Sequence, residues 1–115
     1  MQSQQVLEVN TPALSQAATT DPNIHSFKTS AGYLHTSPEF PMKRLIAAYL
    51  CDIYQMASVF RDDEQSRNHN AEFVLLEWYR MGMDHHDLMR DVAALLLECW
   101  LLTGKAWHEP NTLSY

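Results

Sequence analysis

Apolar side chains recur at helical spacing along the chain from residue 38 onward. The first predicted helix runs from about Pro38 to Phe60, with Ser37 as its N-cap and Glu39 in its first turn. Placed at about 100° per residue, its apolar positions share one broad face. These positions are Met42, Leu45, Ile46, Tyr49, Leu50, Ile53, Met56, Ala57 and Phe60. The pattern predicts an amphipathic helix packed along one side.

Two further helices are predicted after a polar connection. The second runs from about Ala71 to Met81, ends at Gly82, and is apolar nearly all round its axis. The third begins at Asp84 as N-cap and ends before Gly104. The predicted fold is therefore all-α: a small antiparallel three-helix bundle over residues 38–104.

The flanking segments are polar and carry few large apolar residues. Residues 1–37 are rich in Ser, Thr, Gln and Asn, which predicts a flexible N-terminal arm, either passive or ordered by a partner. Within it, Ile24–His35 could form a short strand with Gly32 as a turn residue. Residues 105–115 are expected to form a tail that packs on the helices or stays loose.

The predicted bundle has more apolar surface than three short helices can bury among themselves. A unit of this size is marginal alone, and a contiguous apolar surplus is typical of a protein-binding surface. The alternative is that the arm or the tail covers this surplus within one chain. The candidate partner-binding residues are Phe73, Leu76, Leu97, Trp100 and Leu101. The expected partner is a second copy, giving a homodimer, or a dedicated partner protein.

Composition narrows the function classes. The 115 residues carry fourteen acids against eight bases, a formal net charge of −6, which disfavours binding to nucleic acid through its phosphates. Two cysteines do not make a disulfide-rich secreted domain, and neither a signal peptide nor a bilayer-spanning apolar stretch is visible. A cytoplasmic protein with no membrane partner is expected.

The most reactive side chains gather at the start of the third predicted helix. His85, His86, Asp87 and Asp91 are of types that bind metals or transfer protons, so a metal-dependent enzyme is one alternative. Adjacent histidines on a helix point about 100° apart, however, and a helix start favours acids for electrostatic reasons alone. A second alternative, a helix-turn-helix DNA-binding regulator, would bring these acids against phosphate.

The function predicted from sequence is a small acidic, non-catalytic interaction protein: an adaptor, a chaperone or an inhibitor of a regulator. It would act through its apolar helical surface, with the acidic edge selecting the partner. No catalytic residue, metal ligand or cofactor site is predicted. The three glycines form no phosphate-binding loop, and no family motif is recognised.

Overall fold

The computed structural model describes residues 4–62, 69–108, 111 and 113, and divides the chain into two compact units. The first unit is Met1–Met81 and the second is Gly82–Tyr115. The two units are described separately below.

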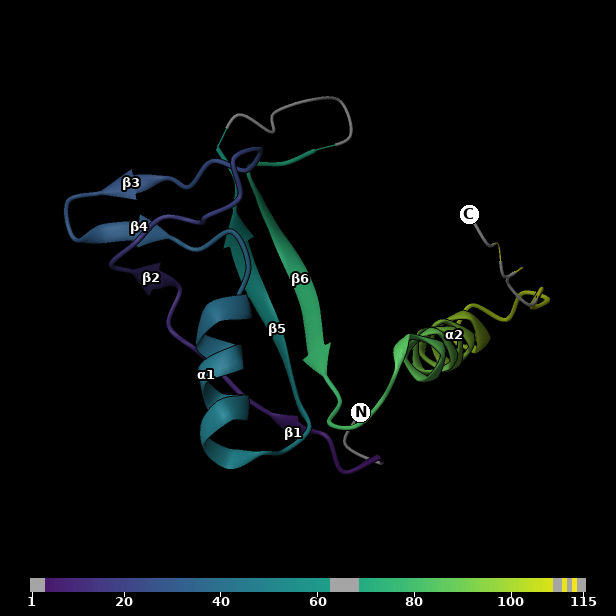
Figure 1. Ribbon diagram of the computed structural model, residues 1–115. Coiled ribbons are helices and arrows are strands. Elements are labelled where there is room, and N and C mark those ends of the chain that lie inside the picture. Colours follow the sequence, from purple (N-terminus) through teal and green to yellow (C-terminus); the bar gives the residue numbers. More distant parts are fainter. Residues whose placement is uncertain (1–3, 63–68, 109–110, 112, 114–115) are drawn as a thin grey trace. The chain divides into compact units, whose positions relative to one another are not determined.

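The first unit is mixed α/β. One sheet has the order β1-β5-β6, formed by Leu7–Glu8, Ile53–Phe60 and Glu72–Tyr79. The other has the order β2-β4-β3, formed by Leu14–Ser15, Gly32–Leu34 and Lys28–Thr29. The helix α1, Glu39–Tyr49, leads from the second sheet into β5 and runs along the first sheet (Figure 1). The described residues therefore form two three-stranded sheets and two helices, and the prediction of an all-α three-helix bundle is wrong.

The second half of the first predicted helix is the strand β5. Helix α1 stops where Leu50 adopts a left-handed conformation, with φ 50° and ψ 48°. From Ile53 onward burial alternates strictly, so Ile53, Gln55, Ala57 and Val59 are buried while Met56 and Ser58 are exposed. This period of two is the signature of a strand with one covered face. The same apolar residues also fit a helical period, which misled the interpretation of the sequence.

The second predicted helix is the strand β6. Its sequence EFVLLEWY is rich in aromatic and large aliphatic residues that suit a pleated surface. The strand pairs antiparallel with β5 over its whole length, from Ile53 opposite Tyr79 to Phe60 opposite Glu72. Its apolar residues would point all round the axis of a helix, but in a strand they lie on the two faces of the sheet.

Residues 4–37 are also more regular than predicted. They contain β1 to β4, and β4 continues into the chain that enters α1. Within Ile24–His35, where a single short strand with Gly32 as a turn residue was possible, Lys28–Thr29 and Gly32–Leu34 pair as two antiparallel strands, and Gly32 is the first residue of β4. Gln55 ties the extended chain to β5, since its buried Oε1 accepts from the Thr11 N–H at 3.2 Å and the Thr11 hydroxyl at 2.9 Å. The prediction of a flexible polar arm is therefore wrong.

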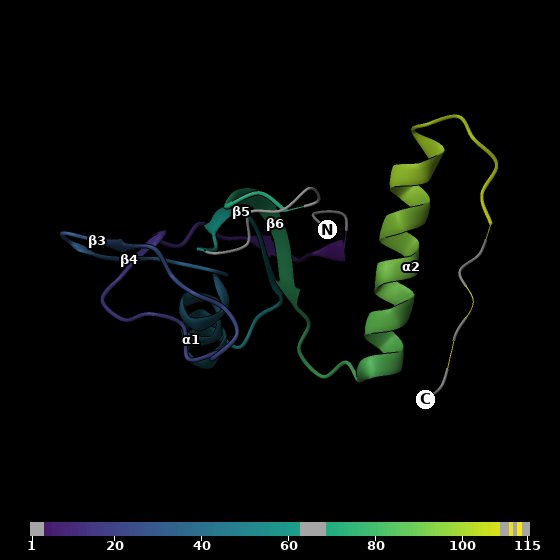
Figure 2. The same cartoon turned by 90° about the horizontal axis from the view of Figure 1, so that it is seen from above.

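The core of the first unit lies between α1 and the first sheet (Figure 2). Met42 of α1 and Val59 of β5 are wholly buried, and Ile53 is 1% exposed. Residues directly opposite on an antiparallel pair share a face, so Glu77 and Tyr79 lie on this covered face, opposite Gln55 and Ile53. Two polar side chains of β6 are thus carried toward the start of α1.

The second unit contains the helix α2, His85–Leu101, where the third helix was predicted. The Asp84 carboxylate accepts from the Asp87 N–H at 2.9 Å and the Asp87 carboxylate accepts from the Asp84 N–H at 3.1 Å, a reciprocal capping box. Beyond the helix, the Trp100 indole N–H donates to the Ala106 carbonyl at 2.7 Å, and Trp107 stacks edge-on against Trp100. No helix among the described residues is long and apolar enough to cross a membrane.

Candidate functional site

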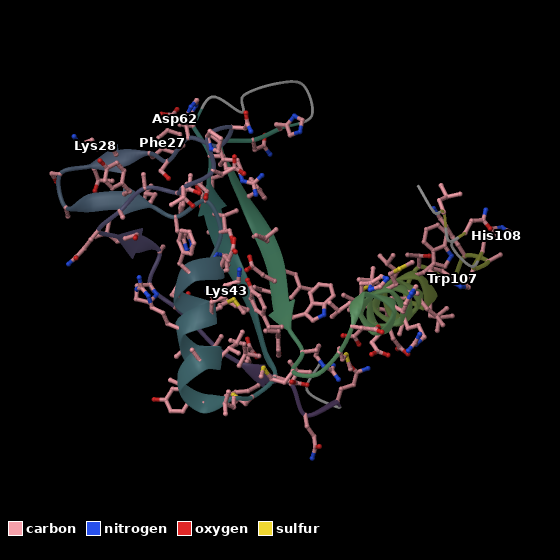
Figure 3. The ribbon with its side chains drawn as sticks, viewed as in Figure 1. Phe27, Lys28, Lys43, Asp62, Trp107 and His108 are labelled. Atoms are coloured by element: carbon pink, nitrogen blue, oxygen red, sulfur yellow. The ribbon has the colours of Figure 1, made fainter. Side chains whose placement is uncertain are left out.

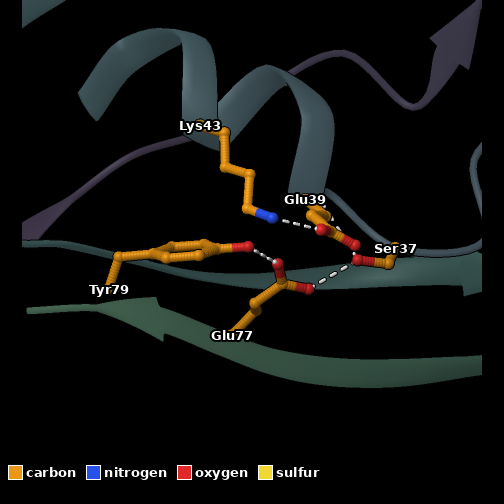
Figure 4. Close-up of polar contacts among 5 residues, drawn as sticks. All are labelled: Ser37, Glu39, Lys43, Glu77 and Tyr79. Carbon is orange, nitrogen blue, oxygen red and sulfur yellow. Dashed lines mark hydrogen bonds and ion pairs between the residues drawn. The ribbon is translucent and has the colours of Figure 1, made fainter. Parts of the chain in front are cut away.

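Ser37 joins the start of α1 to the middle of β6. Its hydroxyl donates to Glu77 Oε2 at 2.6 Å and accepts from the Glu39 N–H at 3.0 Å (Figure 4). The same hydroxyl thus fixes a carboxylate and satisfies one of the free N–H groups at the helix N-terminus. The segment Ser37–Glu39, called here the Ser-Pro-Glu turn, is thereby held against β6.

Glu77 is bound at both of its oxygens. The Tyr79 hydroxyl donates to Oε1 at 2.6 Å, while Ser37 holds Oε2. Burial raises the pKa of the Tyr79 phenol far above its usual range, and the hydrogen bond to Glu77 and the negative charges of Glu77 and Glu39 raise it further. Tyr79 therefore keeps its proton and remains a donor, and Glu77 keeps lone pairs for another donor.

Glu39, the last residue of the Ser-Pro-Glu turn, adds a second carboxylate. Its Oε1 lies 2.5 Å from the Lys43 ammonium, one helical turn further along α1. Glu39 also contributes to the field that raises the Tyr79 pKa, so its charge acts on the same place as that of Glu77. The site thus contains the carboxylates of Glu39 and Glu77 and the ammonium of Lys43.

Arg61 brings a guanidinium to Thr36, the residue before the Ser-Pro-Glu turn. It follows β5, and its Nε donates to the Thr36 carbonyl at 3.3 Å. Its guanidinium carbon lies 5.1 Å from the centroid of the Phe73 ring. A planar guanidinium held on an aromatic face is suited to a carboxylate or a phosphate.

A small cavity of about 40 Å³ opens beside the turn. That volume admits a single small polar group. Its lining residues are Ala17, Ala18, Thr19, Ser26, His35, Thr36, Ser37, Glu39 and Phe40. Of the charged residues described above, Glu39 lines this cavity, while Glu77 and Arg61 bind the lining residues Ser37 and Thr36. Carboxylates suit ammonium groups, and a guanidinium suits an acid group.

The structure separates the five predicted partner-binding residues. Phe73 and Leu76 are in β6 of the first unit and point to opposite faces of the sheet. Phe73 carries the Arg61 guanidinium. Leu97, Trp100 and Leu101 are on α2 in the second unit. A partner-binding role for these residues stays a prediction.

The acidic and histidine residues of Asp84–Asp91 form the N-terminal part of α2. Asp84 and Asp87 cap α2, Arg90 pairs with Asp87, and the rings of His85 and His86 lie 3.9 Å apart. Among the described residues no group of three or more His, Cys, Asp or Glu side chains is arranged to hold a metal ion. The helix-turn-helix alternative is wrong, because the element before Gly82 is the strand β6.

The residues of the site were visible in the sequence but were given other roles. The pattern predicts Ser37 as a helix N-cap and Glu39 in the first helical turn. It leaves Arg61 just after the first predicted helix, and it places Glu77 and Tyr79 in the second. The available signal is Glu77 itself, an acid inside a stretch of large apolar residues.

A Ser37→Ala variant tests the link between the turn and β6. It removes the donor to Glu77 and the acceptor for the Glu39 N–H, so we expect a loss of about 1–2 kcal/mol in the free energy of unfolding. The measurement is the urea unfolding midpoint. Ser58→Ala, at an exposed position of β5, should change it by less than about 0.5 kcal/mol. Equal effects of the two variants would show that the link does not stabilise the fold.

Comparisons with known proteins identify the family of this chain. Residues 1–110 match the family described as tRNA synthetases class II (D, K and N). The chain therefore belongs to the class II tRNA synthetase family. This overturns the prediction of a non-catalytic regulatory adaptor, because the family is one of enzymes.

Two curated relatives are about 50% identical to this chain in sequence. An elongation factor P--(R)-beta-lysine ligase of Vibrio atlanticus is 52% identical over 111 residues, covering 88% of this chain and 34% of the relative. The ligase of the same name from Vibrio cholerae is 54% identical over 101 residues, covering 79% of this chain and 31% of the relative. The chain thus spans about a third of the length of these relatives.

A solved structure has the same fold. The crystal structure of asparaginyl-tRNA synthetase from Pyrococcus horikoshii, complexed with asparaginyl-adenylate, superposes with a TM-score of 0.69. It is 24% identical in sequence, and the match covers 83% of this chain and 23% of that chain. This likeness supports the mixed α/β architecture described above.

Proposed function

We propose that this chain supplies the amino-acid-binding part of a ligase that joins (R)-β-lysine to elongation factor P. The observation that carries the proposal is the Glu77 carboxylate, half-buried and held by Ser37 and Tyr79, with Glu39 close by. (R)-β-Lysine has two amino groups, and the carboxylates of Glu77 and Glu39 provide one acceptor for each. The names of the similar ligases point to the same substrate.

Glu77 takes the ammonium at the end of the substrate side chain. Its two hydroxyl donors fix the carboxylate before the substrate arrives, so little ordering is left for binding. Tyr79 remains protonated and uncharged, so it does not compete with Glu77 for the ammonium. Charge-assisted hydrogen bonds of this kind are about twice as strong as neutral ones.

Arg61 takes the carboxylate end of the amino acid. An adenylate forms when a carboxylate oxygen attacks the α-phosphorus of ATP and pyrophosphate leaves. A guanidinium over that centre binds the carboxylate first and then stabilises the negative charge that develops on the phosphate. A nucleophilic group of elongation factor P then attacks the acyl carbon, and AMP leaves.

In this proposal the protein partner is the protein substrate of the ligase, elongation factor P. It also places the protein in the cytoplasm, where translation factors work. Self-association into a homodimer stays a separate prediction that this site does not require.

The proposal is tested by the mass of elongation factor P after incubation with the full-length protein, ATP and (R)-β-lysine. We expect a gain of one β-lysyl group that requires ATP and is weaker when β-lysine is replaced by 3-aminohexanoic acid, which lacks the terminal ammonium. An unchanged mass, or transfer of the amino acid to tRNA alone, would contradict the proposal.

A further inference from the structure

The ion pair between Glu39 and Lys43 is built to open easily. The two side chains are one helical turn apart on α1, their charged atoms are 2.5 Å apart, and they are 45% and 57% exposed. Exposed pairs at this spacing are weak, because water screens both charges and holding two long side chains costs entropy. Another cation can therefore replace the Lys43 ammonium beside the Glu39 carboxylate.

Glu39 also faces the cavity beside the Ser-Pro-Glu turn. Glu39, Ser37 and Thr36 are among the described residues that line it, whereas Lys43 reaches Glu39 from the next turn of α1 (Figure 4). The Thr36 carbonyl accepts from Arg61, which takes the substrate carboxylate in the proposed function. The amino group nearer that carboxylate is thereby brought to Glu39, in a space that admits one small polar group.

We propose that Lys43 is a built-in competitor for the substrate amino group. In the empty site its ammonium neutralises Glu39, and the amino group of the substrate takes its place. This inference rests on the proposed function and adds a specificity-determining residue to it. Lys43 lowers the affinity for any ligand whose amino group lies near its carboxylate, and ligands without that group bind with Lys43 undisturbed.

The test is the dissociation constant of two probes, measured by titration calorimetry on the full-length protein without ATP. Lys43→Met should bind (R)-β-lysine about two- to fivefold more tightly, the fold-change that corresponds to losing a weak surface pair. It should bind 6-aminohexanoic acid, which lacks the amino group near the carboxylate, as the wild type does. Lys43→Arg restores the competing charge and should restore the wild-type constants.

Lys28→Met is the matched control, because it removes the same charge at an exposed position on β3, away from α1 (Figure 3). It should leave both constants unchanged. An equal gain for both probes in Lys43→Met, or no gain for (R)-β-lysine, overturns the inference while the proposed function stands. A wild-type protein that binds neither probe contradicts the proposed function itself, and the inference falls with it.

Discussion

Glu77→Gln should lower kcat/KM for (R)-β-lysine by roughly 10- to 100-fold, the effect of losing about 1.5–3 kcal/mol of charge-assisted hydrogen bonding. The amide keeps the size of the side chain and can still accept from Ser37 or Tyr79, so the fold should survive. What it loses is the negative charge that attracts the terminal ammonium. The measurement is the rate of β-lysyl transfer to elongation factor P at several substrate concentrations.

The control for this variant is Glu72→Gln on the same strand. Glu72 is exposed at the start of β6, opposite Phe60, and therefore lies on the face of the sheet away from Ser37. Glu72→Gln removes the same charge as Glu77→Gln and should leave kcat/KM within about twofold, as expected of a surface change. If 3-aminohexanoic acid, without the terminal ammonium, were to lose as much rate as β-lysine in Glu77→Gln, the assigned role of Glu77 would be wrong.

Gly32→Ala should cost at least about 3 kcal/mol of folding free energy, the combined cost of backbone strain and overpacking. Gly32 has φ +146°, and a Cβ atom there would lie 2.3 Å from the Ser15 carbonyl oxygen. The obstacle is backbone of the neighbouring strand β2, so it cannot move aside as a side chain would. The readout is the urea unfolding midpoint.

Gly82→Ala separates crowding from backbone conformation. Gly82 also has a positive φ, +74°, but a Cβ atom there would meet no described atom within 4 Å. Its expected cost is only about 1–2 kcal/mol, the penalty of the left-handed conformation. Because β4 leads directly into the Ser-Pro-Glu turn, Gly32→Ala should also weaken binding of the amino acid. Equal losses of stability in the two variants would refute the close approach of β2 to Gly32.

The sequence predicted local structure well where one residue explains one feature. Asp84 caps α2 as expected, and helical spacing from residue 85 onward corresponds to a real helix. The stretch from Met42 to Phe60 failed because its apolar residues fit both periods, and the boundary depends on Leu50 adopting a conformation that a leucine rarely takes. Nothing in the residues around it marks that turn.

The site was harder to predict because its contacts are not local. Ser37 and Glu77 are 40 residues apart, and they meet only because β6 pairs with β5 in a register that turns Glu77 toward α1. Because a helix was predicted where the strand β6 lies, the contact between Ser37 and Glu77 could not be predicted. Glu39 had an adequate local explanation as an acid at a helix start, so its second role was hidden.

The most direct test of the account is a crystal structure of the full-length protein with (R)-β-lysine bound. We predict the terminal ammonium at about 2.7–3.2 Å from the Glu77 carboxylate, with Ser37 and Tyr79 still holding that carboxylate. The substrate carboxylate should lie against Arg61. A ligand bound away from Glu77, or with its carboxylate in place of the ammonium, would contradict the central claim that this cluster recognises the cationic end of the amino acid.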